Sequence, residues 1–309
     1  MSHPKTLNQN APSELLKQLR ADKFIQLLTR TTLFHGVPPT DLPLPVLKNI
    51  YAVTEVMTLP KNCSLQIEPE SSGETFIYEI LSGYVKIYDR VVRSSEKRRQ
   101  PGKKPPALLA WRIPGELLGD FQFTLPETKL EDYIKATDKC CLLKIPSGTI
   151  RQLAASYPQI YLNVASNLAA KAIKARIRAQ ILRLPNIECM VAKLFIELLD
   201  ERKHDSEIPQ CRVINGTFRI EDIAAFLGYE YTSTQVGIHN LINLELIKHY
   251  QNKKSGRFEI CDLSGLRSYL EREIEKAAKQ RKQKGERNSG KSSGDRSGSN
   301  ARSAPASSG

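Results

Sequence analysis

The sequence predicts an α+β protein: an N-terminal all-β sandwich or barrel, one long helix, and a C-terminal helical domain that ends in a hairpin. Three patterns predict this fold class. Short apolar runs separated by turn residues occupy residues 50–146, unbroken helical periodicity covers 158–184, and helices with a tight turn precede a hairpin over 186–260. A length of 309 residues suits two ordinary domains, at roughly 100–200 residues each.

Apolar runs of strand length define the β-rich half. Turn residues such as Asn62, Gly73 and Gly83 separate several of them, and such spacing is typical of a sandwich or barrel. A helical extension with leucines at helical spacing precedes the first run as far as residue 30. The expected strands are 52–59, 64–67, 75–80, 84–88, 107–113, 133–136 and 141–145.

The long helix expected at 158–184 follows a short helix that begins at Ser147. At 1.5 Å per residue it is about 40 Å long, which is more than one small β domain covers. We therefore expect one stripe of the helix to pair with a second copy of the chain, with packing against its own β domain as the alternative. The basic residues Lys171, Lys174, Arg176 and Arg178 lie outside this stripe. The stripe comprises Ile160, Val164, Leu168, Ala172, Ala175 and Ala179.

The segment from 218 to 247 has the pattern of a helix-turn-helix. Apolar positions bury one face of a helix at 220–227, Gly228 permits a left-handed turn, and a second helix follows at 232–244. A helix with an outward polar face fits the major groove of DNA, and a basic hairpin tip suits a wing on the phosphate backbone. The alternative is a three-helix interaction module without DNA affinity. The expected DNA-binding residues are Tyr231, Thr232, Ser233, Gln235, Val236, His239, Asn240, Lys253, Lys254 and Arg257.

The net charge of +13 is concentrated in two segments. Residues 90–104 carry seven basic side chains and one acidic one, and residues 277–309 carry eight basic and two acidic ones. Such segments attract polyanions by counterion release without reading a base sequence. The alternative is that both are solvated charge runs that only aid solubility.

Composition excludes several classes of protein. No run approaches the ~18 apolar residues of a membrane span, and the polar N-terminus has no signal-peptide core. The six cysteines are scattered, which excludes a disulfide scaffold and indicates a cytoplasmic protein. The adjacent Cys140 and Cys141 fit a strand pair better than a redox or metal site. The histidines have no metal-ligand spacing, and no nucleophile–base set or phosphate-cradling loop occurs, so neither an enzyme nor a metal or other cofactor is expected.

With these elements in this order, the chain resembles the Crp/Fnr family of bacterial transcription regulators. The matching motifs are SGYV at 82–85, PGELLGDF at 114–121 and AAFLG at 224–228. The resemblance implies a cyclic-nucleotide-binding-like β-roll, which is a double-stranded β-helix of jelly-roll type, together with a dimerisation helix and a winged helix-turn-helix. It also implies a homodimer on a palindromic operator in double-stranded DNA and an effect on RNA polymerase. The expected boundaries are 1–30 for the helical extension and 31–155 for the roll, with a basic loop at 90–106. The dimerisation helix is expected at 156–185, the winged helix-turn-helix domain at 186–276 and a disordered basic tail at 277–309.

The effector pocket departs from the family pattern. Family members that bind cyclic AMP hold the ribose with a Gly-Glu pair, matched here by Gly119-Asp120, and neutralise the phosphate with an Arg-Ser pair. Counted without gaps, the second pair falls on Leu130-Glu131, where a carboxylate would repel a phosphate, and only Lys129 could compensate. The sequence therefore predicts a degenerate pocket that does not bind cyclic AMP.

The recognition helix departs as well. The family's two arginines and glutamate fall on Tyr231, Thr232 and Val236, so the usual contacts to guanine are missing and the operator differs. Three hypotheses follow. The first is a DNA-binding regulator that needs no ligand or has unusual gating. The second is a regulator gated by another small molecule or by a partner protein, and the third is an architectural DNA-binding protein that acts through its basic loop and tail.

Overall fold

A computed structural model describes residues 21–37, 42–67, 73–89, 107–125, 132–202, 213–214, 219–252 and 255–291. The chain divides into two compact units, one of residues 1–179 with 217–232 and the other of residues 180–216 with 233–309. Within the described ranges, no helix is long and apolar enough to cross a membrane. The expected basic loop at 90–106 lies outside the described residues.

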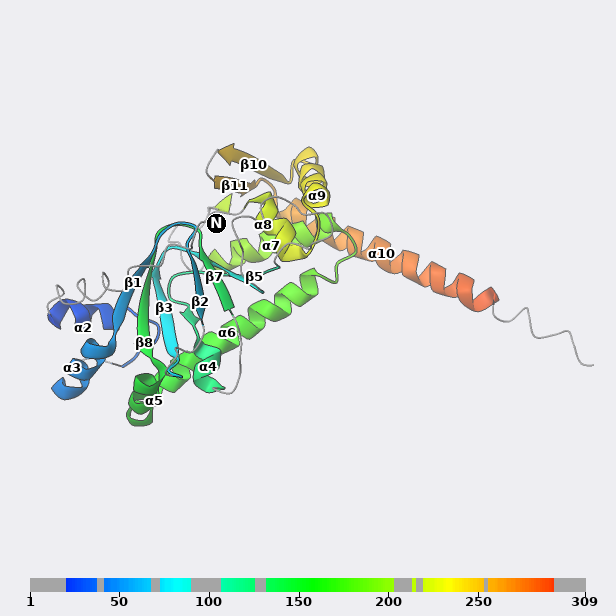
Figure 1. Cartoon of the computed structure of the whole chain (residues 1–309). Helices are drawn as coiled ribbons and strands as arrows, with labels where there is room; N and C mark the ends of the chain where they lie inside the picture. The colour runs from blue at the N-terminus through cyan, green and yellow to red at the C-terminus, as the bar shows by residue number, and fades with distance from the viewer. Residues whose placement is uncertain are drawn as a thin grey trace, which may run out of the picture. The chain divides into compact units, whose positions relative to one another are not determined.

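The first unit is built on two antiparallel four-stranded sheets (Figure 1). One sheet has the order β1-β8-β3-β6 and the other has the order β2-β7-β4-β5. The apolar runs predicted these strands closely, with two exceptions. The run expected as a strand at 52–59 begins in a helix that ends at Val53, and the two-residue strand β6 is too short to show a period. The strands are β1 (Glu55–Leu59), β2 (Ser64–Ile67), β3 (Phe76–Ser82), β4 (Val85–Tyr88), β5 (Leu108–Arg112), β6 (Leu117–Leu118), β7 (Asp132–Ala136) and β8 (Cys140–Pro146).

Strand β3 shows how the roll is filled. Its side chains alternate, as a strand requires: Phe76, Tyr78 and Ile80 join the core that also holds residues of the second sheet, such as Ile87 and Ile134. Ile77 joins a different core on the other face of the sheet. A strand that is covered on both faces reads as a nearly continuous apolar run, and in β3 the buried Glu79 is the one charged interruption.

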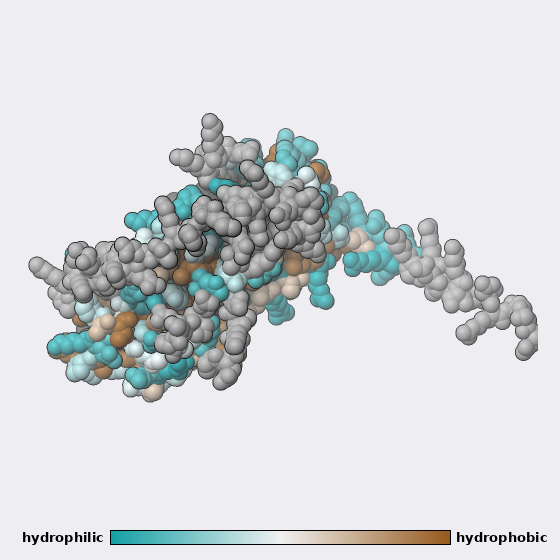
Figure 2. Space-filling view, in the orientation of Figure 1, coloured by the Kyte–Doolittle hydropathy of each residue, from teal (hydrophilic) through white to brown (hydrophobic). Residues whose placement is uncertain are grey.

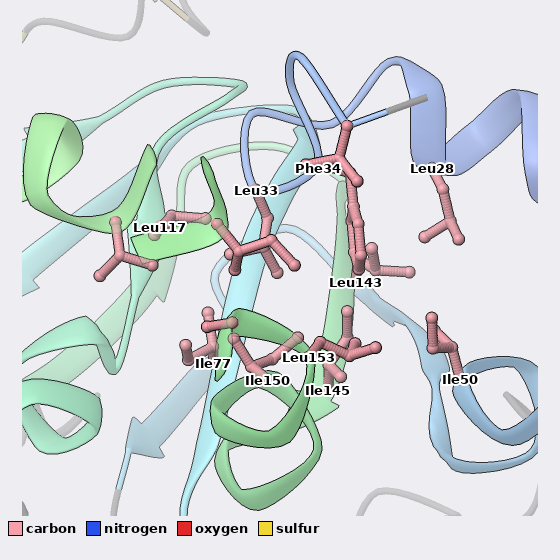
Figure 3. Packing of buried hydrophobic residues seen from close by; sticks show 14 of the residues in the cluster. Leu28, Leu33, Phe34, Ile50, Ile77, Leu117, Leu143, Ile145, Ile150 and Leu153 are labelled. Carbon is pink, nitrogen blue, oxygen red and sulfur yellow. The ribbon is translucent and has the colours of Figure 1, made fainter. Parts of the chain in front are cut away.

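Helices cover the outer face of the β1-β8-β3-β6 sheet. Figure 3 shows Ile150 and Leu153 of α5 near Ile77 and Ile145 of the sheet. The same core includes Leu28 and Ile50, and all six side chains are buried. The helices of this unit are α2 (Ala21–Thr29), α3 (Leu44–Val53), α4 (Asp120–Thr124), α5 (Ser147–Ser156), α6 (Gln159–Ile181, whose last two residues are in the second unit) and α8 (Ile220–Leu227).

The second unit contains a small sheet and three helices. Its strands β9 (Val213–Ile214), β10 (Ile247–Asn252) and β11 (Ser255–Ile260) form an antiparallel sheet in the order β10-β11-β9. Helices α7 (Ile187–Arg202), α9 (Tyr231–Asn243, from Ser233 on) and α10 (Leu263–Lys291) complete it. Phe195 of α7 packs against Phe258 of β11 with ring centroids 4.9 Å apart, which joins helix and sheet.

The prediction of a disordered tail from residue 277 is wrong as far as residue 291, because α10 continues to Lys291. This stretch is rich in Glu, Lys, Ala, Arg and Gln, which are strong helix formers. Lys276 also pairs with Glu273 at 2.6 Å, one turn earlier. The described side chains at the end of α10 are mainly hydrophilic and exposed (Figure 2). Residues 292–309 lie outside the described part of the chain.

A buried carboxylate, Glu79 of β3, holds the turn before the roll. Its two oxygens accept the backbone N–H groups of Thr32 at 2.5 Å and Leu33 at 3.1 Å, and the residue is 2 % exposed. Burial raises the pKa of Glu79 to about 7, although these two hydrogen bonds oppose the rise.

The raised pKa of Glu79 gives a pH dependence of known sign. The folded state binds the proton more tightly than the unfolded chain, whose pKa is near 4.5, so the contribution of Glu79 becomes more favourable as pH falls from about 7 to 4.5. We compare the free energy of unfolding of the wild type with that of the Glu79→Gln variant. As pH falls from about 7 to 4.5, we expect the wild-type value minus the variant value to rise by about 3 kcal/mol. Urea titrations at several pH values measure it, and a difference that stays constant would contradict the assignment.

Candidate functional site

The predicted helix-turn-helix segment begins with α8 and turns at Gly228. Gly228 lies in the left-handed region at φ 73°, and the Tyr229 N–H donates to the Ala224 carbonyl at 3.0 Å, which closes the helix. No neighbour lies within 4 Å of a Cβ placed at Gly228, so the backbone conformation alone explains the glycine. Helix α9 begins three residues later, at Tyr231.

Helix α9 presents the polar face that its sequence predicts. Thr232, Ser233, Val236, His239 and Asn240 are exposed. Tyr231 and Gln235 are half-buried. The opposite face is buried and contains Thr234, Gly237, Ile238 and Leu241. The described part of the expected DNA-binding helix is therefore free for a partner on one side, and its contacts with DNA stay a prediction.

Two contacts within the second unit fix α9 against α7. A Cβ at Gly237 would lie 2.8 Å from Cγ2 of Ile187, so the glycine allows the two helices to approach closely. The Asn240 amide donates to the Glu188 carboxylate at 2.8 Å. Asn240 thus has a structural partner, which the sequence did not indicate, besides any role toward DNA.

The predicted wing is the β10–β11 hairpin. Arg257 is exposed and its guanidinium carbon lies 5.7 Å from the Tyr250 ring centroid. The Tyr250 hydroxyl donates to Glu259 at 2.8 Å, and this hydrogen bond raises the pKa of Tyr250. Lys253 and Lys254, the other two predicted wing residues, lie outside the described residues.

The second candidate site is the Gly119-Asp120 corner of the roll, where α4 begins. Gly119 has φ 76°, and a Cβ there would overlap the Phe76 carbonyl oxygen, so only glycine fits. Asp120 follows as the first residue of α4 and is 1 % exposed. The other residues expected in the pocket, Lys129, Leu130 and Glu131, lie outside the described residues.

Lys171 of α6 fills the space beside Asp120. Its ammonium lies 2.6 Å from both carboxylate oxygens of Asp120 and 2.6 Å from the Leu117 carbonyl, and its side chain is 6 % exposed. Burial lowers the pKa of Lys171, while the charge of Asp120 opposes that shift. Asp120 is therefore paired with a resident cation. The sequence placed Lys171 among polar residues outside the apolar stripe but gave no sign of this partner.

The prediction of the dimer seam is wrong for half of its residues. Ile160 and Val164 are 0 % exposed in the core of their own unit, and Leu168 packs against that core. This stripe covers the roll because it is the most apolar one on α6 and the roll is the nearest apolar surface. The other predicted seam residues, Ala172, Ala175 and Ala179, are exposed, and their place in a seam stays a prediction.

A different face of α6 carries solvent-exposed apolar residues. Leu162 is 58 % exposed and Ile173 is 59 % exposed. Together with the exposed Ser166, Ala169 and Arg176 they recur at alternating intervals of four and three residues. That interval is the seam spacing of a two-stranded coiled coil.

No metal-ligand cluster accompanies these sites: within the described residues, no three His, Cys, Asp or Glu side chains gather to hold an ion. His249 instead stacks on Phe258, with ring centroids 4.3 Å apart. Burial, with His239 nearby, lowers the pKa of His249, which favours the neutral imidazole.

Comparison with solved structures identifies the architecture. No family model and no curated protein sequence matches the chain. A mutant of CooA from Carboxydothermus hydrogenoformans aligns with a TM-score of 0.54 at 16 % identity, over 74 % of this chain and 96 % of CooA. FixK2 from Bradyrhizobium japonicum aligns at 0.51 and 14 % identity, over 70 % and 96 %. A protein from Eubacterium rectale assigned to the crp/fnr family of transcriptional regulators aligns at 0.51 and 16 % identity, over 75 % and 96 %. The predicted fold class is confirmed: the chain has the fold of the Crp/Fnr-type regulators, with a β-roll, a long helix and a helical C-terminal domain.

Proposed function

We propose that the chain is a DNA-binding transcriptional regulator of Crp/Fnr type, which acts as a homodimer and does not respond to cyclic AMP. The observation that carries the proposal is the exposed face of α9 in a chain with this fold. Thirteen residues of helix with small polar side chains at the start fit a major groove, where the first turns meet base edges. By the family resemblance, RNA polymerase would be the protein partner at a promoter.

The side chains of α9 favour contacts to A·T pairs. The exposed start of the helix offers Thr232 and Val236 to a thymine methyl group and Gln235 to the edge of adenine. No arginine lies on α9 to hold a guanine. The operator therefore differs from that of regulators whose recognition helix carries arginines.

The homodimer rests on the outer face of α6. Leu162, Ala169 and Ile173 lie at coiled-coil spacing, and small residues between the larger ones allow two helices to approach closely. Two copies of α9 on a symmetric dimer match a palindromic operator.

The lack of response to cyclic AMP rests on the pairing of Asp120. Asp120 is 1 % exposed and both of its oxygens accept the Lys171 ammonium, so a ribose hydroxyl could reach the carboxylate only by opening this buried pair. Breaking a buried ion pair costs about 3–5 kcal/mol, and one hydroxyl does not return that energy. The sequence also supports this proposal, because Leu130 and Glu131 replace the Arg-Ser pair that neutralises the phosphate in cyclic-AMP-binding members of the family.

Gln235→Ala tests sequence recognition by α9. We expect a loss of ~1–3 kcal/mol in binding to the operator, with relaxed preference at one base pair, because the bidentate amide contact is removed. Genomic fragments selected by the protein at fixed salt supply the operator, and fluorescence anisotropy measures the affinity. Gln280→Ala, on the exposed part of α10, is the matched control. An equal loss on every duplex would make Gln235 a positioning contact, and a wild-type protein without any sequence preference would favour the architectural alternative.

Ile173→Glu tests the seam on α6. A carboxylate from each copy would meet its equivalent across the two-fold axis, so we expect a dimer at micromolar concentration to become a monomer. Sedimentation velocity measures the oligomeric state. Leu44→Glu changes an apolar side chain that is 64 % exposed at the start of α3 and should leave the dimer intact. A variant that stays dimeric would place the interface elsewhere.

Calorimetry tests the effector prediction. We expect no saturable heat when cyclic AMP is titrated into the protein, because Asp120 is already paired. A regulator known to bind cyclic AMP, titrated in the same buffer, is the positive control. A micromolar dissociation constant would contradict the prediction.

A further inference from the structure

One face of α6 carries a row of polar side chains that bond to the roll. They recur every three or four residues, so they share one face of the helix. At the start, the Asn163 amide donates to the Leu33 and His35 carbonyls at 3.0 and 2.8 Å. One turn on, the Asn167 side-chain oxygen accepts the Leu117 N–H at 3.3 Å. We call this row the polar row; it consists of Asn163, Asn167, Lys171, Lys174 and Arg178.

The centre of the polar row is the buried pair of Lys171 and Asp120. The Lys171 ammonium has three acceptors in fixed directions, two on Asp120 and one on Leu117. Removing two charges from water costs several kcal/mol, so such a pair adds little net stability compared with apolar residues. Its contribution is directional: it sets the rotation and the axial position of α6 on the roll. Lys174 adds a more exposed pair to Glu116 at 3.0 Å.

The far end of the polar row holds α8. Arg178 donates to the Leu109 carbonyl and to the Phe226 carbonyl, both at 2.9 Å. Its guanidinium also lies 4.6 Å from the Phe226 ring centroid, and that ring packs against Trp111 at 4.5 Å. The Phe226 carbonyl belongs to the last turn of α8, where helix carbonyls lack helical partners and attract positive charge.

The other end of α8 is held by the roll itself. Lys86 of β4 pairs with Asp222 at 2.6 Å, and both side chains are largely buried. Asp222 also accepts the Arg219 N–H at 3.2 Å in the first turn of α8. These contacts explain why α8 belongs to the same compact unit as the roll and α6.

We propose that the buried Lys171–Asp120 pair sets the position of Arg178 on α6 and thereby the hydrogen bond from Arg178 to the last turn of α8. The two side chains are seven residues apart, which is two turns or about 10 Å along one face of a single helix. A change at Asp120 that moves or rotates α6 therefore moves the two guanidinium nitrogens with which Arg178 donates hydrogen bonds. The regulatory meaning rests on the proposed function, because α8 is then the first helix of the DNA-binding motif.

Hydrogen exchange of the α8 amides in the full chain tests the coupling without DNA. Lys171→Met keeps the length of the side chain and removes the charge and its three hydrogen bonds. We expect the 224–227 amides to exchange about tenfold faster relative to the β3 and β8 core amides, a change within the usual range of coupling between sites. Arg178→Lys should have a similar effect, and the double variant should add little to either single one.

Controls separate this outcome from a general loss of stability. Lys61→Met removes an exposed pair to Asp138 in the same unit and should leave the α8 amides unchanged. Should Lys171→Met fail to fold, Asp120→Asn preserves the shape of the site and should accelerate exchange in α8 in the same way. Unchanged α8 exchange in a folded Lys171→Met or Asp120→Asn variant, or additive effects of Lys171→Met and Arg178→Lys, would overturn the proposal. The proposed function fails separately, through the lack of an operator.

Discussion

The buried pair of Lys171 and Asp120 is the interaction on which the arrangement of the first unit depends. It joins the long helix to the one corner of the described roll where a helix begins at a left-handed glycine. Because Gly119 has no side chain, its backbone lies close to the Phe76 carbonyl, and because Asp120 is buried, its charge needs a partner within reach. Lys171 is that partner, and the rest of the polar row is positioned by the same helix.

The same pair gives a physical meaning to the departures from the family pattern. A pocket that awaits a ligand keeps polar groups open for it, whereas here the acidic group is neutralised from within the chain. The long helix thus has three roles on three faces. An apolar stripe covers the roll, a polar row bonds to it, and a third stripe, at heptad spacing, is exposed.

Helix α8 belongs to two parts of the fold at once. In sequence it is the first half of a helix-turn-helix, but its contacts through Trp111, Lys86 and Arg178 group it with the roll. Only three residues of turn, Gly228, Tyr229 and Glu230, separate the end of this helix from the start of α9.

The sequence by itself determined most of the elements, because their signals are local, but it did not predict α3, α4 or β6. Apolar runs predicted the strands, Gly228 predicted the turn, and the alternation of apolar and polar positions predicted which side of α9 faces solvent. The sequence did not determine partners that are distant along the chain. Glu79 with Thr32, Asp120 with Lys171 and Asp222 with Lys86 are between about 50 and 140 residues apart, and no periodicity records such pairs. The tertiary structure also decided which stripe of α6 is buried, because two faces of that helix are apolar and only the position of the roll selects between them.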